Sequence, residues 1–375
     1  MDIKNPERMQ RLKEKLSNLG KESNICLIYD IDADGMSSGS LIKHAFEKMG
    51  LGFKLELTDI TRKAVLSEEN QKKIKNAQID CIVATDMSFP GFKMLEDCRK
   101  LTQEGINFIV FDHHEYEPSM QGDNSLLIHP VDIFGEEHSA MCASKLVYDI
   151  LGKFVPLSEY DWIKCIGMIG DMNFLRYPEE VNEIIRKYDT KAAPISSNDD
   201  YFQSKLGRLS QLVNLPMVIG TNESLTDMFK AYSESRSLDE LAEKLGKTDV
   251  KEVDDQIAHY TGDFENLAVK TGDIYFLQLD SKYILGSAVS SIISFKKKDN
   301  TFIVYQKKGD SVIVSSRRQD HKYSMRDLMK LSVNGLQNAN GGGHIPAAGA
   351  SIMAQDWEIF KQHLLDNYAK AKVDA

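Results

Sequence analysis

The chain has 375 residues, of which 42% are hydrophobic, a length and composition that predict two globular domains. A formal net charge of −10 argues against a protein that binds nucleic acid over its whole surface, and no apolar run approaches the ~20 residues that would cross a membrane. The five cysteines are scattered and form no Cys-x-x-Cys pair, which argues against a disulfide framework and a thiolate zinc site. The first residues lack the basic-then-apolar layout of a secretion signal, so we expect a cytoplasmic protein.

The first chemically informative segment follows a short apolar run at residues 25–28, which predicts a buried strand. Three aspartates, Asp30, Asp32 and Asp34, alternate directly after it. Side chains two apart in an extended segment point the same way, so we expect these carboxylates to converge. Converging like charges repel unless a cation lies among them. A divalent metal at the end of a strand is the simplest interpretation, and a solvated Asp-rich turn is the alternative for this segment alone.

Short apolar strands alternate with amphipathic helices through the first half of the chain. The patterns predict helices at residues 6–19, 37–49, 66–76 and 91–103, and strands at 25–28, 53–57, 81–84 and 108–111. This alternation is typical of an α/β fold with a doubly wound, mainly parallel sheet. Asp86 follows the third strand, and Asp112, His113 and His114 follow the fourth.

Acidic groups therefore lie beyond the carboxyl ends of three strands, where open α/β sheets bind ligands. Helices predicted at 139–150 and 161–168 follow, and Asp171 comes after the second. Carboxylates with imidazole favour Mn²⁺ or Mg²⁺, with Fe²⁺ or Co²⁺ as alternatives. One cation rarely needs so many ligands, so we expect two, which together activate water and grip a phosphate oxygen. The candidate ligands are Asp30, Asp32, Asp34, Asp86, Asp112, His113, His114 and Asp171.

The second half of the chain begins with a charged helical pattern and ends with a strand-rich region. We predict a metal-binding α/β domain at 1–180, a helical connector at 181–268 and a smaller α/β domain at 269–375. Strands are predicted at 274–277, 301–305 and 312–316, with a hairpin turn at 307–310 and a last helix from Trp357. Residues 281–330 carry eleven Lys or Arg and four acids, which suits a phosphate-bearing ligand or is a lysine-rich solvent face.

A glycine-rich segment near the C-terminus is the last candidate site, with the sequence Gly341-Gly342-Gly343-His344. Glycines let a backbone approach a ligand closely and can present N–H groups to an anion, and His344 can donate to a phosphate. Residues 346–348 could open a helix whose N-terminus attracts negative charge, whereas a tight turn is the alternative. Arg317 can clamp a phosphate with two N–H groups or form a surface ion pair.

Taken together, these motifs resemble those of the DHH phosphoesterase superfamily. The resemblance lies in Asp30-x-Asp32-Ala33-Asp34-Gly35, the lone Asp86, Asp112-His113-His114 and Gly170-Asp171. Val314-Ser315-Ser316-Arg317 and Gly341-Gly342-Gly343-His344-x-x-Ala347-Ala348-Gly349 resemble its DHH-associated C-terminal domain. The first pattern is similar to the RecJ-like branch, which includes archaeal RecJ and GINS-associated nucleases.

The resemblance implies two Mn²⁺ or Mg²⁺ on the first of two domains and a cleft in which the second domain grips nucleic acid. It implies metal ligation by Asp32, Asp34, Asp86, Asp112, His113 and Asp171. It also implies a role for His114 in ligation or at the scissile phosphate, and phosphate contacts for Arg317 and His344. Relatives commonly have Asn-Pro where this chain has His129-Pro130, and related phosphodiesterases more often have His in place of Asp30.

Three functional hypotheses follow. The first is a metal-dependent exonuclease that hydrolyses single-stranded DNA or RNA to mononucleotides. The second is a phosphodiesterase for short oligoribonucleotides or for linear or cyclic dinucleotides. The third is a replication-complex scaffold that binds a protein such as GINS, and the complete ligand set weighs against it. The sequence leaves open the polarity of digestion and the choice between DNA and RNA.

Overall fold

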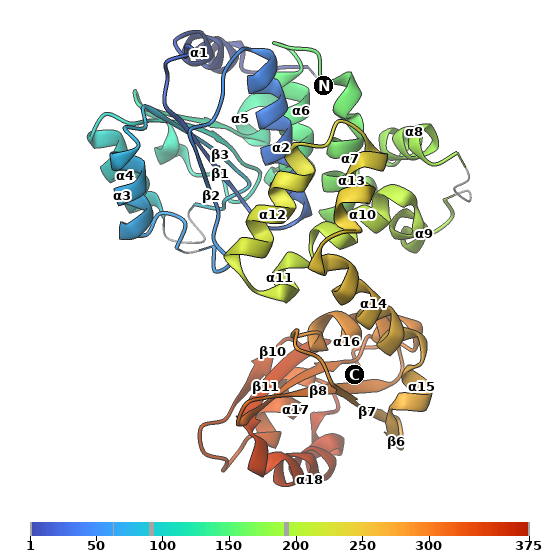
Figure 1. Ribbon diagram of the computed structural model, residues 1–375. Helices are drawn as coiled ribbons and strands as arrows, with labels where there is room; N and C mark the ends of the chain where they lie inside the picture. The colour runs from blue at the N-terminus through green and yellow to red at the C-terminus, as the bar shows by residue number, and fades with distance from the viewer. Residues whose placement is uncertain (1, 63, 90–93, 191–194, 374–375) are drawn as a thin grey trace. The chain divides into compact units, whose positions relative to one another are not determined.

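The computed structural model describes residues 2–62, 64–89, 94–190 and 195–373 (Figure 1). The chain divides into two compact units, Met1–Val250 and Lys251–Ala375, each of which is described by itself. The helices predicted as a connector are shared between these units. The three-part domain division drawn from the sequence therefore stays a prediction.

The first unit is built on a parallel sheet of five strands in the order β2-β1-β3-β4-β5. Every residue of β1 and β3 is buried, because central parallel strands are covered on both faces. The sequence pattern predicted the first four strands and missed β5. The strands are β1 (Ile25–Tyr29), β2 (Leu55–Leu57), β3 (Cys81–Thr85), β4 (Asn107–Phe111) and β5 (Ser125–Ile128).

Helices cover both faces of this sheet, which confirms the predicted doubly wound arrangement (Figure 1). Helices α3 and α4 lie on one face, and α2, α6 and α7 pack together on the other. The start predicted for α4 at residue 91 lies outside the described residues. The helices are α1 (Pro6–Ser17), α2 (Ala33–Lys48), α3 (Glu68–Asn76), α4 (Leu95–Gln103), α5 (Pro130–Phe134), α6 (Ala143–Leu151) and α7 (Asp161–Gly170).

The following region is helical, as its pattern predicted. Helix α10 packs on α7, and α12 packs on α2, where Phe229 stacks on Tyr29 with ring centroids 3.7 Å apart. These contacts bring the later helices against the face of the sheet that carries α2. The helices are α8 (Pro178–Tyr188), α9 (Asn198–Gln203), α10 (Lys205–Val213), α11 (Pro216–Ile219), α12 (Asn222–Ser233), α13 (Leu238–Leu245), α14 (Asp249–Gly262) and α15 (Phe264–Leu267).

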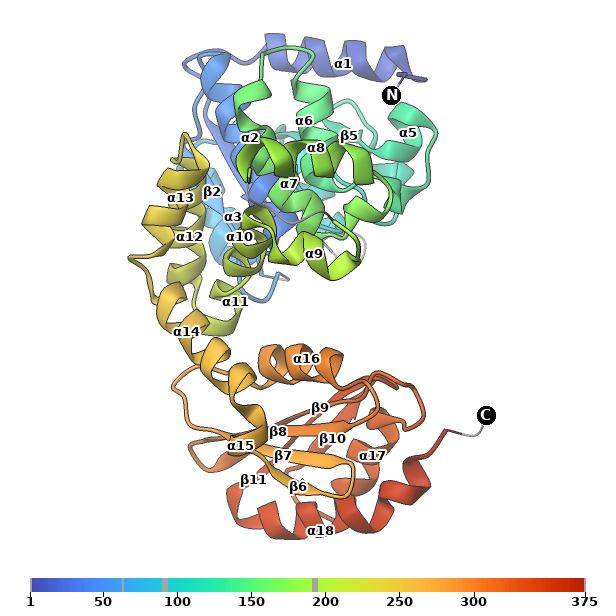
Figure 2. The same cartoon turned by 90° about the vertical axis from the view of Figure 1, so that its right-hand side faces the viewer.

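The second unit is built on a mixed sheet in the order β10-β11-β9-β8-β7-β6, in which only β7 and β8 are parallel neighbours. Helix α16 (Gly286–Lys296) lies on one face, and α17 (Met325–Ser332) and α18 (Trp357–Asn367) lie on the other (Figure 2). The strands are β6 (Val269–Thr271), β7 (Ile274–Leu279), β8 (Thr301–Lys308), β9 (Ser311–Arg317), β10 (Asn340–Gly343) and β11 (Ala347–Met353).

One prediction for this unit is confirmed and one is wrong. Strands β8 and β9 form the predicted hairpin, with Gly309 and Asp310 at the turn. The helix predicted to open at residues 346–348 is absent, because Ala347 begins strand β11. Alternate residues of this strand, including Ala348 and Ile352, are buried against the core, so a period of two decides the structure. No helix within the described ranges is long and apolar enough to cross a membrane.

Candidate metal centre

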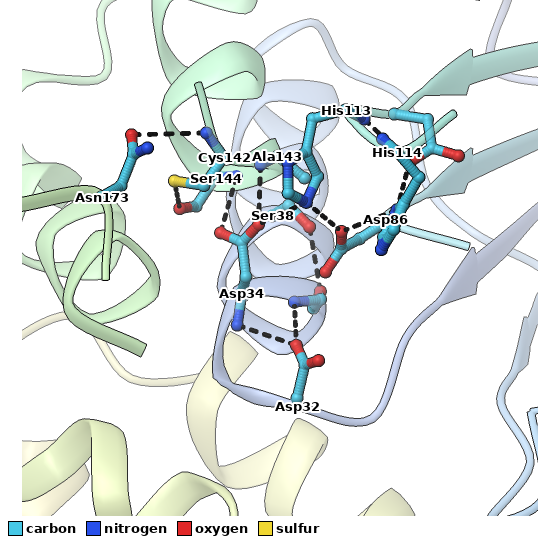
Figure 3. Close-up of polar contacts among 12 residues, drawn as sticks. Asp32, Asp34, Ser38, Asp86, His113, His114, Cys142, Ala143, Ser144 and Asn173 are labelled. Atoms are coloured by element: carbon cyan, nitrogen blue, oxygen red, sulfur yellow. Dashed lines mark hydrogen bonds and ion pairs between the residues drawn. The ribbon is translucent and has the colours of Figure 1, made fainter. Parts of the chain in front are cut away.

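The side chains predicted as metal ligands meet beyond the carboxyl ends of β1, β3 and β4 (Figure 3). They surround a cavity of about 80 Å³. Asp30 and Asp112 contact residues of the cavity wall without lining it themselves. The lining residues are Asp32, Ala33, Asp34, Asp86, His113, His114, Gly170, Asp171 and Asn214.

Asp86 lies at the centre of this cluster. It follows β3 in a left-handed backbone conformation (φ 61°), and it is only 2% exposed. Its Oδ1 lies 3.2 Å from Nε2 of His113 and 3.7 Å from Nδ1 of His114. Burial, together with the charges of Asp34 and other nearby carboxylates, raises the pKa of Asp86 well above its ordinary value. A carboxylate in such surroundings is stabilised when a cation compensates its charge.

Asp32 caps helix α2, which begins four residues earlier than predicted. Its Oδ1 accepts the backbone N–H groups of Asp34 (3.1 Å) and Gly35 (3.0 Å), as an N-cap carboxylate does. Asp34 therefore lies in the first turn of a helix and not in an extended segment. Asp32 and Asp34 both line the cavity, but a helix start and not an extended segment brings them there, and they belong to different possible ligand groups (Figure 3).

The carboxylate of Asp34 is held by the N-terminus of α6. Its Oδ2 accepts the N–H of Ala143 at 2.6 Å, and its Oδ1 accepts the N–H of Ser144 at 3.0 Å (Figure 3). Asp34, Cys142 and Asp171 also form a possible metal-binding group. One ligand atom from each of the three side chains lies within 4.8 Å of the other two. Burial of the Asp171 carboxyl, together with the charge of the nearby Asp34, raises the pKa of Asp171 to about 7. Sequence reasoning missed Cys142, whose pKa is raised by burial.

Asp30 has a charged partner that the sequence did not indicate. Nε of Arg62 lies 2.7 Å from Oδ1 of Asp30, and Nη2 of Arg62 donates to Oδ2 of Asp32 at 3.0 Å. Burial and the charge of Asp32 raise the pKa of Asp30 to about 7, although Arg62 acts in the opposite direction. Arg62 thus neutralises part of the negative charge on one side of the cluster.

Asp112 orients the two histidines that follow it. Its Oδ1 accepts the backbone N–H of His113 (2.8 Å) and lies 2.7 Å from Nδ1 of His114. Burial acts to raise the pKa of Asp112, but the hydrogen bond and charge of His114 outweigh it and hold that pKa below its ordinary value. An ionised Asp112 favours the tautomer of His114 that carries its proton on Nδ1, which leaves Nε2 as the acceptor nitrogen.

Two further residues position the site from a distance in sequence. His129 accepts the N–H of Val131 on Nδ1 at 3.2 Å, so its Nε2–H donates to the carbonyl of His114 at 3.0 Å. Asn214, after α10, accepts the N–H of Ala33 on Oδ1 at 2.8 Å and lines the cavity. The sequence singled out His129 only as a departure from a family pattern and gave no signal for Asn214.

The residues predicted to contact phosphate lie in the second unit. Arg317, at the end of β9, donates from Nε to Oγ of Ser291 (3.1 Å) and from Nη2 to Oγ of Ser287 (3.0 Å). The glycines form β10, where Gly341, Gly342 and Gly343 pair with residues of β11. His344 occupies the turn to β11, and its backbone N–H donates to the carbonyl of Ala347 at 2.7 Å.

Comparisons with known proteins agree with this architecture. The model of the DHH family, N-terminal domain, matches residues 24–167, and that of the DHHA1 domain matches residues 277–370. The single-stranded-DNA-specific exonuclease RecJ of Bacillus subtilis is 25% identical over 181 residues, which cover 46% of this chain and 22% of that protein. The match therefore spans about a fifth of the length of this curated relative.

Two solved structures share the fold at low sequence identity. A crystal structure of an exonuclease RecJ bound to manganese aligns with a TM-score of 0.65 and 16% identity, covering 99% of this chain and 96% of that one. RecJ of Thermus thermophilus in complex with Mn²⁺ aligns with a TM-score of 0.60 and 15% identity, covering 97% of this chain and 54% of that one. With the two matched domains and the RecJ relative, the chain belongs to the DHH phosphoesterase superfamily as a RecJ-like protein.

Proposed function

We propose that this protein is a cation-dependent exonuclease that hydrolyses single-stranded DNA or RNA and releases mononucleotides. The observation that carries this proposal is the cluster of buried carboxylates around the 80 Å³ cavity. Oδ1 of Asp86 and Nδ1 of His113 are buried there without a hydrogen bond of good geometry to any described residue. Unpaired oxygen and nitrogen atoms beside several carboxylates fit a site for divalent cations.

Two cations of the Mn²⁺ or Mg²⁺ class suit these donors. Asp86 belongs to two of the possible ligand groups, one with both histidines and one with Asp30 and Asp32, so it is the natural shared ligand. When bound, such a pair supplies an activated water and neutralises the charge of the phosphate. The manganese in two structural relatives supports the choice of metal. The proposed ligands are Asp32, Asp34, Asp86, Asp112, His113 and Asp171. We leave Asp30 out of this set because its carboxylate lies against the guanidinium of Arg62.

The chain's own residues supply positioning and proton transfer. His114 donates its Nδ1–H to Asp112 and has a 38% exposed side chain. Its Nε2 can take up a proton from solvent, and the resulting imidazolium can deliver that proton to the leaving oxygen. In the second unit, Arg317 is pre-oriented by two serine hydroxyls, and we assign it, with His344, to the phosphates of the strand.

A digest of end-labelled strands in Mn²⁺ tests this function. Wild-type protein, Asp86→Asn and a control, Asp123→Asn, are compared on 5′- and 3′-labelled single-stranded DNA and RNA of graded length. Asp123 is an exposed carboxylate that does not line the cavity. We expect mononucleotide release by wild type and control, and a loss of more than about 100-fold in Asp86→Asn. Equal rates in all three proteins would reject the proposal.

The same digest separates the alternative substrates. An exonuclease degrades long strands, whereas a phosphodiesterase for short oligoribonucleotides or dinucleotides acts only at the short end of the series. A protein partner from a replication complex, such as GINS, is a separate proposal. A pull-down with wild-type and Asp86→Asn protein tests whether such binding is independent of hydrolysis.

A further inference from the structure

Helix α16 of the second unit, with the residues just before it, presents an apolar stripe to solvent. Ile284, Ile292 and Phe295 are 48%, 41% and 59% exposed. The spacing of the last two places them along one side of the helix. The opposite side, with Val289 and Ile293, is buried over β8 and β9 (Figure 2). Large apolar side chains grouped on an exposed helix face mark a binding surface more often than isolated ones do.

A preoriented cation flanks this stripe. The guanidinium of Arg317 is fixed by Ser287 and Ser291, which lie two turns and one turn before Phe295 on the same helix. Among the residues that the structure describes, no carboxylate pairs with Arg317 and no hydrogen bond uses its Nη1. This group therefore retains both its charge and free N–H donors for an anion.

Cations outnumber acids around the stripe. Lys296, Lys297 and Lys298 follow one another at the end of α16, and Asp299 comes next in the sequence. Lys297 is paired with Glu265, and Nζ of Lys296 donates to a backbone carbonyl, so Lys298 and Arg317 are the cations left for a ligand. An apolar stripe bordered by an excess of positive charge is complementary to a single strand, whose bases are flat and apolar and whose linkages are anionic.

We propose that this stripe is a stacking platform for the bases of single-stranded nucleic acid, with Phe295 and Ile292 beneath the bases and Arg317 on the neighbouring phosphate. The inference rests on the proposed function and narrows it, because a platform of two helical turns serves strands of several nucleotides and not dinucleotides. A protein ligand would bury the apolar side chains equally well, but it offers no regular row of anions for Arg317 and Lys298.

Fluorescence anisotropy with a labelled oligothymidylate of about 12 nucleotides tests the platform. The matched control is Ile359→Ala, because Ile359 is 49% exposed on α18, on the other face of the sheet. We expect Phe295→Ala to raise the Kd by about 5-fold or more, Phe295→Trp to restore it, and the control to match wild type. Thermal melts check that all variants are folded. An unchanged Kd in both Phe295→Ala and Ile292→Ala/Phe295→Ala would overturn the proposal.

Hydrolysis measurements keep this test distinct from that of the proposed function. Phe295→Ala should lose more kcat/KM on the 12-mer than on a dinucleotide, because a dinucleotide is too short to cover the platform. If wild-type protein binds the 12-mer through Phe295 but hydrolyses no strand, the proposed function fails and the platform stands. If Phe295→Ala changes the oligomeric state in light scattering without changing the Kd, the stripe is a contact between copies and the platform is refuted.

Discussion

Asp34 and Ala143 are 109 positions apart in the sequence, yet the carboxylate of Asp34 accepts the backbone N–H of Ala143 at 2.6 Å. This bond joins the first turn of α2 to the first turn of α6. The N-terminus of a helix presents N–H groups without partners inside the helix, and α6 directs two of them, on Ala143 and Ser144, at the carboxylate of Asp34. The position of one proposed ligand therefore depends on how closely α2, α6 and α7 pack.

Gly167 on α7 tests this dependence. A Cβ atom at this position would lie 2.7 Å from Cβ of Ser144 and 2.8 Å from Oδ1 of Asp34, too close without movement of α6 or α2. We expect Gly167→Ala to lower the free energy of unfolding by about 1–3 kcal/mol and to weaken Mn²⁺ binding. Urea unfolding and calorimetric titration measure the two effects. Gly52→Ala, with open space around the new Cβ, is the control. Unchanged Mn²⁺ affinity in Gly167→Ala would mean that Asp34 does not depend on this packing.

Asp30 predicts a pH dependence of stability without divalent cations. Burial and Asp32 raise its pKa to about 7 in the folded protein, so the folded state binds more protons than the unfolded chain between about pH 4 and pH 7. The unfolding free energy of wild type minus that of Asp30→Asn should therefore fall as pH rises through this window. The two proteins are compared because His44 has the opposite effect on the unfolding free energy. Burial lowers the pKa of His44 to about 4, so its contribution rises with pH, and it does so equally in both proteins. Urea unfolding in a chelator measures the difference, and a difference that grows with pH would contradict the prediction.

His129 is expected to act as a brace for the loop that carries His114. His129→Ala removes the donor to the His114 carbonyl and the acceptor for the N–H of Val131, so we expect a loss of about 1–3 kcal/mol in unfolding free energy and slower hydrolysis. Asn at this position can still cap α5 but is too short to replace both bonds. His129→Asn should therefore be intermediate in chemical denaturation and in rate. If Asn and Ala behave alike, the cap contributes nothing measurable.

His344 should affect binding of the strand and not of the metal. Its side chain is exposed at the turn between β10 and β11, where only the backbone is hydrogen-bonded to Ala347. We expect His344→Ala to raise KM several-fold, by about the 1 kcal/mol of one hydrogen bond, with Mn²⁺ affinity and thermal stability unchanged. His259→Ala, another exposed histidine of the same unit, is the control. A KM equal to that of wild type would remove His344 from the substrate contacts.

Local sequence patterns predicted much of the first unit, because buried parallel strands are short apolar runs and their carboxyl ends share one edge of the sheet. The residues that the patterns missed act across long distances. Arg62 reaches Asp30 from 32 positions away, and Asn214 reaches Ala33 from 181 positions away. Neither contact leaves a periodic signal, since only the packing of α10 and of the loop after β2 creates it.

The C-terminal glycine run shows a different limit. Glycine fits an anion-binding turn, a helix start and a strand equally well, because it has no side chain that restricts the backbone. The alternation of buried residues on β11 decided the outcome, but its alanines carry a weak hydrophobic signal. Tertiary pairing with β9 therefore determined what the sequence left open.

The most direct test of the account is anomalous diffraction from crystals soaked in Mn²⁺. We predict two anomalous peaks about 3.5–4 Å apart in the cavity, each within bonding distance of Asp86 and together contacting Asp34, His113 and Asp171. A cavity without an anomalous peak at saturating Mn²⁺, or peaks that these four side chains do not contact, would contradict the proposed metal centre and the hydrolysis that depends on it.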